Sequence, residues 1–332
     1  MMREKGYIRT RIKKIGWMLN EYVDHDLNML QKTLVLIDLA VSIVIYGVGI
    51  TDYFQYQFYK RRHLDRKDFI VHRKRMWLVR TFNNKEDRLI FDDKARFNSV
   101  FNNYLHRRWL NISNCTFEEF KDFVAEESKF MVKPLQGSHG IGIRIVDIGD
   151  YINLEALFLD LKVEQCIIEE LIEQSEDLAE FNPSSVNTLR VVSLLSNDGK
   201  ARLMTANLRV GHGNKHADNF HHEGIAALID LETGLVVTTG IDKNLKRYIV
   251  HPVSGKQIVG FKVPFWGRVK ETVRQAAQVL PTVRYVGWDL TIGNKGEVII
   301  VEGNAAADPD LSQMPDQIGK WPLFREVIRG KQ

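Results

Sequence analysis

The stretch FMVKPLQGSHGIGIRIVDI, residues 130–148, decides the fold because it sets a flexible turn between two runs of β-type residues. Glycines in such a turn let backbone amides approach a ligand without Cβ clashes. Amide, hydroxyl and imidazole groups can then donate to phosphate oxygens, and a lysine adds a positive charge. The residues concerned are Lys133, Gly137, Ser138, His139, Gly140 and Gly142. The spacing matches neither a Walker A loop nor a dinucleotide fingerprint, so a phosphate loop and a plain glycine-rich hairpin are equally good interpretations.

A second stretch, GWDLTIGNKGEVIIVEGN at residues 287–304, has the strongest metal-binding pattern. A turn at 294–296 predicts a hairpin with Asp289 on its first strand. Glu302 and Asn304 lie two positions apart on the returning strand, so they share one face, and the hairpin can bring Asp289 beside them. Two carboxylates and an amide suit Mg²⁺, which proteins commonly hold together with substrate phosphates. We favour a magnesium site over a merely polar hairpin face.

A third stretch, CIIEELIEQSED at residues 166–177, follows the glycine-rich turn and ends a predicted strand in two adjacent carboxylates. The free backbone after Glu169 and Glu170 could bind an adenine ring, and Glu176 could bind ribose hydroxyls. The alternative is a solvated acidic face, which is the usual role of such a run.

The composition is that of an ordinary soluble globular protein, with 332 residues, 44% apolar and 27% charged. A net charge of +4 suits anionic substrates such as nucleotides and is too weak to indicate nucleic-acid binding. Cys115 and Cys166 lack metal-type spacing, and a disulfide framework is not expected. Two buried thiols fit a reducing environment, so we predict a cytoplasmic protein.

Short β-rich runs separated by turn signals dominate the chain after residue 129, with one long helical pattern at 265–280. A doubly wound parallel sheet would need a helix after nearly every strand, so we predict an α+β fold with mainly antiparallel sheets. The expected divisions are an N-terminal helical region at 1–66, a helical lead-in at 67–127, a unit with the phosphate loop at 128–178, and a unit with the metal and acceptor site at 179–332.

The N-terminal region contains the apolar run LVLIDLAVSIVIYGVGI, residues 34–50, after a basic stretch. A helix of this length spans only about 25 Å, less than the hydrocarbon core of a bilayer. Asp38 inside the run would cost roughly 2.5–3.5 kcal/mol in lipid. We therefore expect a buried helix, with membrane-surface contact by the basic residues 1–30 as the less favoured alternative. The aromatic and basic residues at 52–69 are expected to pack on neighbouring elements rather than to stack on bases.

Taken in order, these stretches resemble the ATP-grasp superfamily, and specifically the ATP-grasp proteins associated with sugar transfer. The resemblance covers residues 85–320 through DDKARFN (92–98), the phosphate-loop stretch, NPSSVNTLRVVS (182–193), ADNFHHEGIAALIDLETG (217–234), HPVSG (251–255) and the hairpin at 286–304. It implies an ATP-grasp fold, two α+β subdomains clasping ATP after the N-terminal helical region.

The resemblance also implies roles for individual residues. Lys94 and Lys133 would hold the α- and β-phosphates, and the loop from Gly137 to Gly142 would close over the β- and γ-phosphates. Glu169 and the backbone of Glu170, Leu171 and Ile172 would bind adenine, and Glu176 the ribose. Asp289, Glu302 and Asn304 would hold one or two Mg²⁺ ions, with Mn²⁺ as an alternative. Arg190 and Arg209 would face the γ-phosphate and the acceptor carboxylate, and Asp218 and Asn219 are candidates for acceptor contacts.

The chain departs from its relatives at Gly287, where the D-alanine ligase branch has an arginine two residues before the metal aspartate. The oxyanion contact would then pass to Arg190 or Arg209. The sequence AAADPDLSQ at 305–313 replaces a common proline–glycine turn, and helices replace the usual first α/β domain. These departures leave the acceptor unidentified.

The resemblance implies ADP-forming ligation of a carboxylate, for example a sugar acid or a nucleotide-sugar, to an amine or another nucleophile through an acylphosphate. A surface-polysaccharide or glycoconjugate precursor is the expected product. A kinase that transfers the γ-phosphate to a hydroxyl is the first alternative, and a non-catalytic nucleotide-binding module is the second. The histidines of 212–222 suit a substrate-facing loop better than a zinc site.

Overall fold

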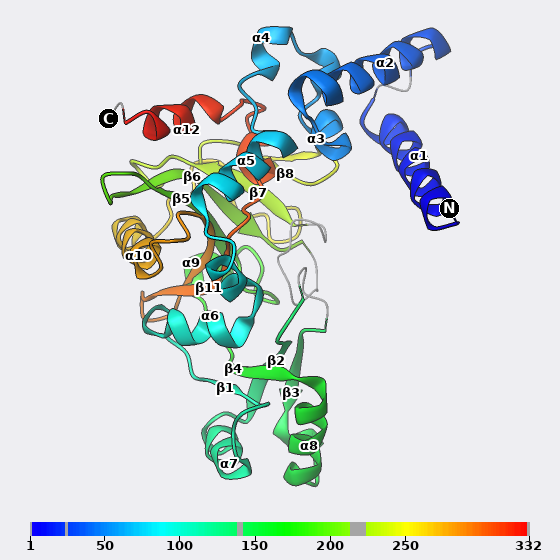
Figure 1. Cartoon of the computed structure of the whole chain (residues 1–332). Coiled ribbons are helices and arrows are strands. Elements are labelled where there is room, and N and C mark those ends of the chain that lie inside the picture. The colour runs from blue at the N-terminus through cyan, green and yellow to red at the C-terminus, as the bar shows by residue number, and fades with distance from the viewer. Residues whose placement is uncertain (1, 24–25, 138–141, 213–223, 331–332) are drawn as a thin grey trace.

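Two antiparallel sheets organise the chain in the computed structural model, which describes residues 2–23, 26–137, 142–212 and 224–330 (Figure 1). The small sheet has the order β1-β4-β2-β3 and the large sheet the order β11-β10-β5-β6-β7-β8-β9. The small sheet contains β1 (Trp109–Asn111), β2 (Lys129–Pro134), β3 (Arg144–Asp147) and β4 (Cys166–Glu170). The large sheet contains β5 (Thr188–Leu195), β6 (Ala201–Val210), β7 (Ile225–Ile229), β8 (Gly240–Ile241), β9 (Arg247–Tyr248), β10 (Tyr285–Ile292) and β11 (Val298–Asn304). The expected α+β fold with antiparallel sheets is confirmed.

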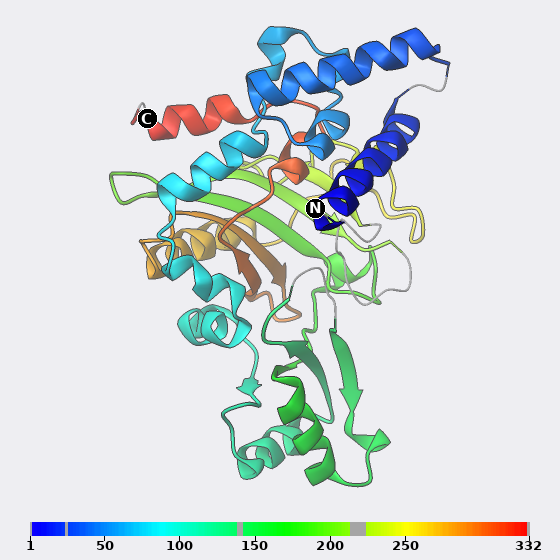
Figure 2. The ribbon, with the colours of Figure 1, turned by 45° about the vertical axis from the view of Figure 1, so that its right-hand side comes forward.

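The large sheet is covered on both faces, so β5, β7 and β10 are buried along their whole length. Alternate side chains of a strand point to opposite faces. Helix α10 (Trp266–Val279) covers one face of the sheet, and α5 (His72–Phe82) and α12 (Trp321–Ile328) cover the other (Figure 2). Val191 accordingly packs with α10, whereas Val192 packs with α5 and α12. Two further short helices, α9 (Glu176–Ala179) and α11 (Asp310–Gln313), border this sheet.

The small sheet has its own core beneath α7 (Phe117–Glu126) and α8 (Leu154–Glu164). A capping box formed by Thr116 and Glu119 begins α7. Both cysteines belong to this core and are free thiols, as expected.

The stretch 67–127 is mostly helical, as expected, with η2 (Asp87–Asp92), α6 (Lys94–Val100) and η3 (Asn102–Tyr104) after α5. It also contributes β1 to the small sheet, and α7 packs on that sheet. The sequence did not predict that this stretch belongs with the small sheet. Strand β1 is three residues long, too short for a period-two pattern to be recognised. A single turn, η4 (Ile148–Asp150), follows β3.

The N-terminal region is helical, as expected, and consists of α1 (Met2–Tyr22), α2 (Met29–Tyr46), α3 (Ile50–Gln55), η1 (Phe58–Lys60) and α4 (His63–Arg66). Its aromatic residues form a buried cluster that reaches Ala226 and Ile241 of the large sheet and Leu311 and Met314 after it. The expected packing role of the aromatic stretch is therefore confirmed.

The expectation that the apolar run at 34–50 forms a buried helix is wrong. Among the described residues, α2 is long and apolar enough to cross a membrane by length and composition, and only 22% of its apolar window is buried. Val35, Leu39 and Ser42 face the protein, whereas Ile37, Val41 and Val44 are exposed. Hydropathy reports that side chains are apolar, and it does not report whether protein covers them.

Candidate active site

Asp289 lies at the centre of a charged cluster on one face of the large sheet. It sits on β10 directly opposite Arg190 of β5, and Arg209 on β6 lies on the same face. Arg190 binds the Asp289 carboxylate through two nitrogens, with Nη2 donating to Oδ2 at 2.8 Å, and Arg209 Nη1 lies 2.9 Å from Oδ1. All three side chains are buried. The sheet register, not a local motif, brings them together.

Glu302 lies opposite Asp289 on β11, at a β-bulge that follows Asp289, and Asn304 lies two positions farther on the same face. The two carboxyl groups are within hydrogen-bonding range of each other. The hairpin geometry predicted for these three residues is thus present. The Asn304 amide oxygen also accepts from the Ala306 amide at 2.8 Å, which orients it.

The surroundings of Asp289 and Glu302 shift the pKa values of their carboxyl groups in opposite directions. Burial raises the pKa of Asp289, but Arg190 and Arg209 more than offset this and hold that pKa below its usual range. Glu302 keeps an exposed side, yet packing around its carboxyl group and the adjacent Asp289 charge raise the pKa of Glu302. A cation bound beside these two carboxyl groups would favour the charged form of Glu302, because a nearby opposite charge lowers the pKa of a carboxyl group.

The donor set fits Mg²⁺ in part. No group of three or more His, Cys, Asp or Glu side chains suited to a metal occurs among the described residues. Magnesium commonly takes one or two carboxylates and completes its shell with phosphates and water. Glu302 and Asn304 meet that requirement, whereas Asp289 already receives charge from two arginines.

Two glycines in this cluster make room for larger groups. A Cβ at Gly303 would lie 2.7 Å from Phe97 and 2.8 Å from Phe91, which pack against β11 between Glu302 and Asn304. A Cβ at Gly287 would lie 2.8 Å from the Ala307 Cβ and 3.4 Å from the Arg190 Cδ. The close approach to Ala307 therefore favours glycine at 287, and Arg190 packs against this position at ordinary contact distance.

Lys133 is held by a buried network in the small sheet. Its Nζ donates to Glu169 Oε2 at 2.6 Å, while Arg107 donates from Nε at 3.0 Å and from Nη2 at 3.2 Å. The Asn98 amide donates to Glu169 Oε1 at 2.7 Å. Burial raises the pKa of Glu169, and Arg107 and Lys133 more than offset this, so the carboxylate stays charged.

The expected contact of Glu169 with adenine is not supported for its side chain. A carboxylate has about four acceptor positions, and these four donors fill them. Glu169 instead positions Lys133. Arg107 also donates to the Ile300 and Val301 carbonyls of β11, at 2.8 and 3.2 Å, so the same network joins the two sheets.

Lys94 begins α6 and lies between the two charged clusters. Its Nζ donates to the Gly137 carbonyl at 3.1 Å. Burial lowers the pKa of Lys94, and the nearby Glu302 and Glu169 charges oppose this while Lys133 adds to it. The two lysines expected to bind phosphate and the carboxylates expected to bind metal therefore share one location, where the small sheet meets the large one.

The predicted adenine and ribose residues form the connection between the sheets. The Glu170 carboxylate accepts from the Arg108 amide at 3.0 Å. Leu171 and Ile172 follow the end of β4 and are partly exposed. Beyond them, the Ser175 amide donates to the Ile292 carbonyl at 2.7 Å, which fixes the chain to β10. Glu176 is exposed at the start of α9.

Several predicted site residues lie outside the described residues: Ser138, His139, Gly140, Asp218 and Asn219, and with them His216, His221 and His222. Gly137 and Gly142 flank the first gap, and both have positive φ, +130° and +78°. A side chain would be strained at these positions, as the glycine-rich pattern suggested.

Sequence reasoning missed the residues that position the site. Arg107 and Asn98 carried no recognisable spacing because their partners are 62 and 71 positions away. It also gave no role to His251 and Asn187. His251 Nε2 lies 2.8 Å from the Gly211 carbonyl, and the Asn187 Oδ1 accepts from the Gly211 amide. These two contacts fix the end of β6, just before the predicted acceptor residues.

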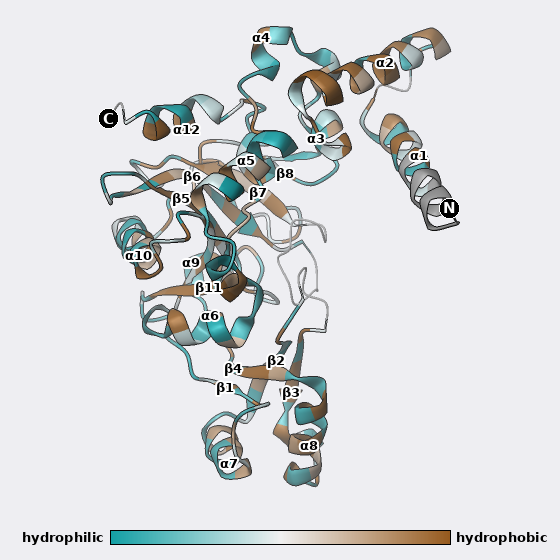
Figure 3. Ribbon diagram, viewed as in Figure 1, coloured by the Kyte–Doolittle hydropathy of each residue, from teal (hydrophilic) through white to brown (hydrophobic). Residues whose placement is uncertain are grey.

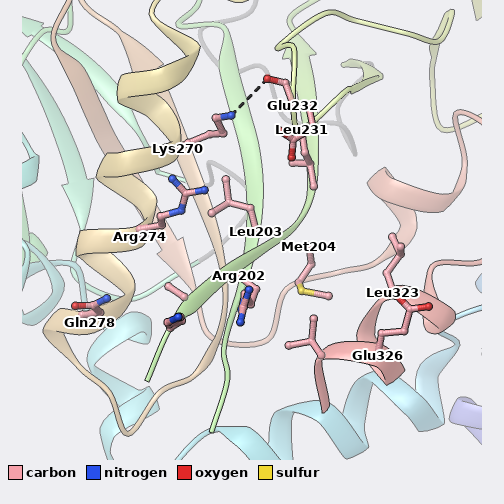
Figure 4. A pocket seen from close by; sticks show the side chains of 13 residues that line it. Arg202, Leu203, Met204, Leu231, Glu232, Lys270, Arg274, Gln278, Leu323 and Glu326 are labelled. Atoms are coloured by element: carbon pink, nitrogen blue, oxygen red, sulfur yellow. Dashed lines mark hydrogen bonds between the residues drawn. The ribbon is translucent and has the colours of Figure 1, made fainter. Parts of the chain in front are cut away.

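A pocket of about 500 Å³ lies elsewhere, between α10, β6 and α12 (Figure 4). Lys200, Arg202, Lys270 and Arg274 line it together with Glu232 and Glu326, and Lys270 donates to the Glu232 carbonyl. None of the predicted site residues lines this pocket, so it is separate from the charged cluster.

Comparison with known proteins identifies a matching protein family. A family model described as sugar-transfer associated ATP-grasp matches residues 73–328. Among curated proteins none matches the chain.

Three solved structures illustrate the similarity in fold. The ATP-grasp ligase PsnB with its minimal precursor is 17% identical over 74% of this chain and 63% of its own, with a TM-score of 0.47. The ADP complex of N5-carboxyaminoimidazole ribonucleotide synthetase is 12% identical over 79% and 59%, with a TM-score of 0.48. An L-amino acid ligase from Bacillus licheniformis is 12% identical over 72% and 48%, with a TM-score of 0.42. The chain spans less than two thirds of the length of each of these structures.

Proposed function

The chain belongs to the sugar-transfer associated ATP-grasp family, and on that premise we propose that it is an ADP-forming ligase that activates a carboxylate through an acylphosphate. One observation carries the proposal: Lys94 lies near both Lys133 and Glu302, and Glu302 faces the arginine-paired Asp289, where the small sheet meets the large one. A cationic group that holds phosphates beside an acidic group that holds a metal is the arrangement that ATP chemistry requires.

The nucleotide end of the site is supported by the positions of the two lysines. Lys133 is preorganised by Glu169, and Lys94 bridges to the start of the glycine-rich turn. We propose that both bind ATP phosphates, with the backbone of Glu170, Leu171 and Ile172 at adenine and Glu176 at ribose. Since these residues connect the sheets, nucleotide binding would also fix the relative position of the two units.

Glu302 and Asn304, with Asp289, would hold Mg²⁺, which would supply neutralisation of the negative charge on the ATP phosphates. The chain's own contribution is positioning and fixed positive charge. Arg190 and Arg209 would stabilise the negative charge that develops on the transferred phosphoryl group and on the acceptor carboxylate. Arg190 lies beside Gly287 on the neighbouring strand, the position where relatives of the D-alanine ligase branch carry an arginine.

The reaction would proceed in two steps. An acceptor carboxylate oxygen attacks the γ-phosphorus, the bond to the β-phosphate bridging oxygen breaks, and ADP leaves. An amine nitrogen then attacks the acyl carbon, inorganic phosphate leaves, and the amine loses a proton. We propose a sugar acid or a related polysaccharide precursor as the carboxylate, in keeping with the family's description, and Asp218 and Asn219 as its contacts.

The test is phosphate release from MgATP with a pool of carboxylates, including sugar acids, and hydroxylamine as the amine. Hydroxylamine converts an acylphosphate to a hydroxamate, so only the acid must be found. We expect carboxylate-dependent phosphate release with hydroxamate formation, and loss of both in Glu302→Ala. The matched control is Glu297→Ala, at the other end of the same hairpin, where the carboxylate accepts only from the turn.

Two outcomes would contradict parts of the proposal. MgATP turnover that persists in Glu302→Ala would remove the metal assignment. Phosphate transfer to a sugar hydroxyl, with no hydroxamate from the pool, would replace the ligase by a kinase that uses the same nucleotide site.

A further inference from the structure

Helix α2 exposes its apolar side chains on one side of the molecule. Its N-terminus begins with a capping box at Asn28 and Gln31, and it ends at Gly47 in a left-handed conformation, so its limits are well defined. The exposed apolar side chains are Met29, Leu30, Leu34, Leu36, Ile37, Val41, Ile43, Val44 and Ile45. Val44 is 77% exposed and Ile37 is 54% exposed, which in water is unfavourable. Brown segments of α2 mark this surface in Figure 3.

The two polar side chains in the middle of the apolar run, Asp38 and Ser42, point the opposite way, into the protein. Asp38 forms an ion pair with Arg66 at 2.7 Å and accepts from the Tyr53 hydroxyl at 2.7 Å. Ser42 is fully buried and accepts from the same Arg66 at 3.1 Å. Helices on the surface of a water-soluble domain show the reverse pattern, with charges outside and apolar residues inside. The α2 pattern is that of a helix whose outer side meets an apolar medium.

Asp38 no longer argues against lipid contact, because its charge is neutralised on the protein side. The same contacts argue against a helix that crosses the bilayer. Val35 and Leu39 pack into the core shared with α3 and η1, so one side of α2 stays attached to a folded domain. A helix with one apolar side and one attached side suits the membrane surface, where such a side sinks into the boundary between headgroups and acyl chains.

Basic residues lie near the C-terminal end of the same helix. Residues 60–75 carry eight Lys or Arg and two Asp. Arg73 donates to the carbonyls of Val44 and Ile45 at the end of α2, and His63 of α4 contacts Tyr46. Leu64 on α4 is 73% exposed and adds to the apolar surface. Basic groups beside an apolar face match the anionic headgroups of a cytoplasmic membrane surface.

We propose that the outer side of α2, with Leu64, is an interfacial anchor by which this protein lies on an anionic membrane surface. A second copy of the chain fits this surface less well, because a symmetric dimer through α2 would set the basic borders of the two copies against each other. The anchor is independent of the nucleotide site and goes beyond the proposed function. It would place a ligase where membrane-attached acceptors are found.

The test is sedimentation of the full chain with vesicles of phosphatidylcholine alone and of phosphatidylcholine mixed with phosphatidylglycerol. We expect binding to the mixed vesicles that weakens in high salt, because exposed charges are screened. The double variant Ile37→Glu/Val44→Glu should bind at least about ten-fold more weakly, since two apolar contacts are replaced by charges. Both positions are exposed, so the variant should unfold at the same temperature as the unaltered protein.

The matched control is Leu159→Glu/Val163→Glu, which places the same charges on exposed apolar positions of α8, at the opposite end of the molecule (Figure 1). This control should bind vesicles as the unaltered protein does. Equal binding by the two double variants would overturn the proposal. Resistance of the protein to carbonate extraction from cell membranes would also overturn it, because α2 would then span the membrane. So would a protein that does not bind vesicles but forms a dimer, if Ile37→Glu/Val44→Glu converts that dimer to a monomer.

Discussion

The salt bridge between Arg107 and Glu169 allows a direct comparison of a buried and an exposed ion pair on adjacent residues. The Arg107 and Glu169 side chains are 2% and 3% exposed. Its neighbour Arg108 pairs with Glu126, and these side chains are 40% and 70% exposed. We predict that Arg107→Met destabilises the protein far more than Arg108→Met does.

The magnitude follows from what each substitution leaves behind. Arg107→Met leaves a buried carboxylate with Lys133 and Asn98 only, and removes the donors to the Ile300 and Val301 carbonyls. Breaking a buried pair on one side costs about 3–5 kcal/mol, and the remaining Lys133 favours the lower end of that range. An exposed pair such as Arg108–Glu126 contributes about 0–1 kcal/mol.

The assay is unfolding by urea at neutral pH, followed by circular dichroism, with thermal melting alongside. With an unfolding entropy of about 2.1 cal/mol/K per residue, a loss of about 3 kcal/mol should lower the melting temperature by roughly 4 °C in a chain of 332 residues. Unfolding free energies of the two variants that agree within about 0.5 kcal/mol would refute the reasoning, because burial would then not decide the value of the pair.

The pH dependence has a defined sign. The pKa of Glu169 is lower in the folded protein than its ordinary value of 4.5, so its stabilising contribution is present above that value and is lost as the pH falls below it. The difference in unfolding free energy between Arg107→Met and the unaltered protein should therefore be largest at neutral pH and should shrink in acid. A difference that grows in acid would mean that Glu169 is not the charge that Arg107 stabilises.

Three further predictions concern the neighbourhood of the site. Gly303→Ala should destabilise the protein by about 1–3 kcal/mol, because the new Cβ would lie 2.7 Å from Phe97, whereas Gly267→Ala, which meets nothing within 4 Å, should not; urea unfolding checks both. Burial, and to a smaller extent the charge of Asp308, raises the pKa of Asp310 to about 8. Between about pH 4 and pH 8 the folded protein therefore keeps a proton on Asp310 that the unfolded chain releases, and the free energy of unfolding falls as the pH rises through this range. Asp310→Asn should remove this decline, by at most about 4 kcal/mol between pH 5 and pH 8, and parallel pH profiles of the two proteins would contradict it. Glu302→Ala should weaken Mg²⁺-dependent ATP binding at least about ten-fold in calorimetry while leaving the thermal midpoint nearly unchanged, and unchanged binding would show that Glu302 is not a ligand.

The sequence by itself determined the elements and their local geometry. Alternating β-type runs and turn residues located the strands, since strand period and turn chemistry are local properties. The hairpin at 287–304 brought Asp289 opposite Glu302 because the two strands are joined by a short turn. The positive φ at Gly137 and Gly142 and the capping box at Thr116 likewise depend only on local sequence.

Only the tertiary structure decided how distant segments meet. Asp289 and Arg190 are 99 positions apart, and Arg107 and Ile300 are 193 apart, so no local pattern records their contacts. The sequence suggested adenine as the partner of Glu169, whereas in the structure four donors surround its carboxylate, three of them from Asn98 and Arg107 before β1. Helix α2 makes the same point: its apolar composition is local, but which side is covered depends on Arg66 and Tyr53 binding Asp38 and so turning the other side outward.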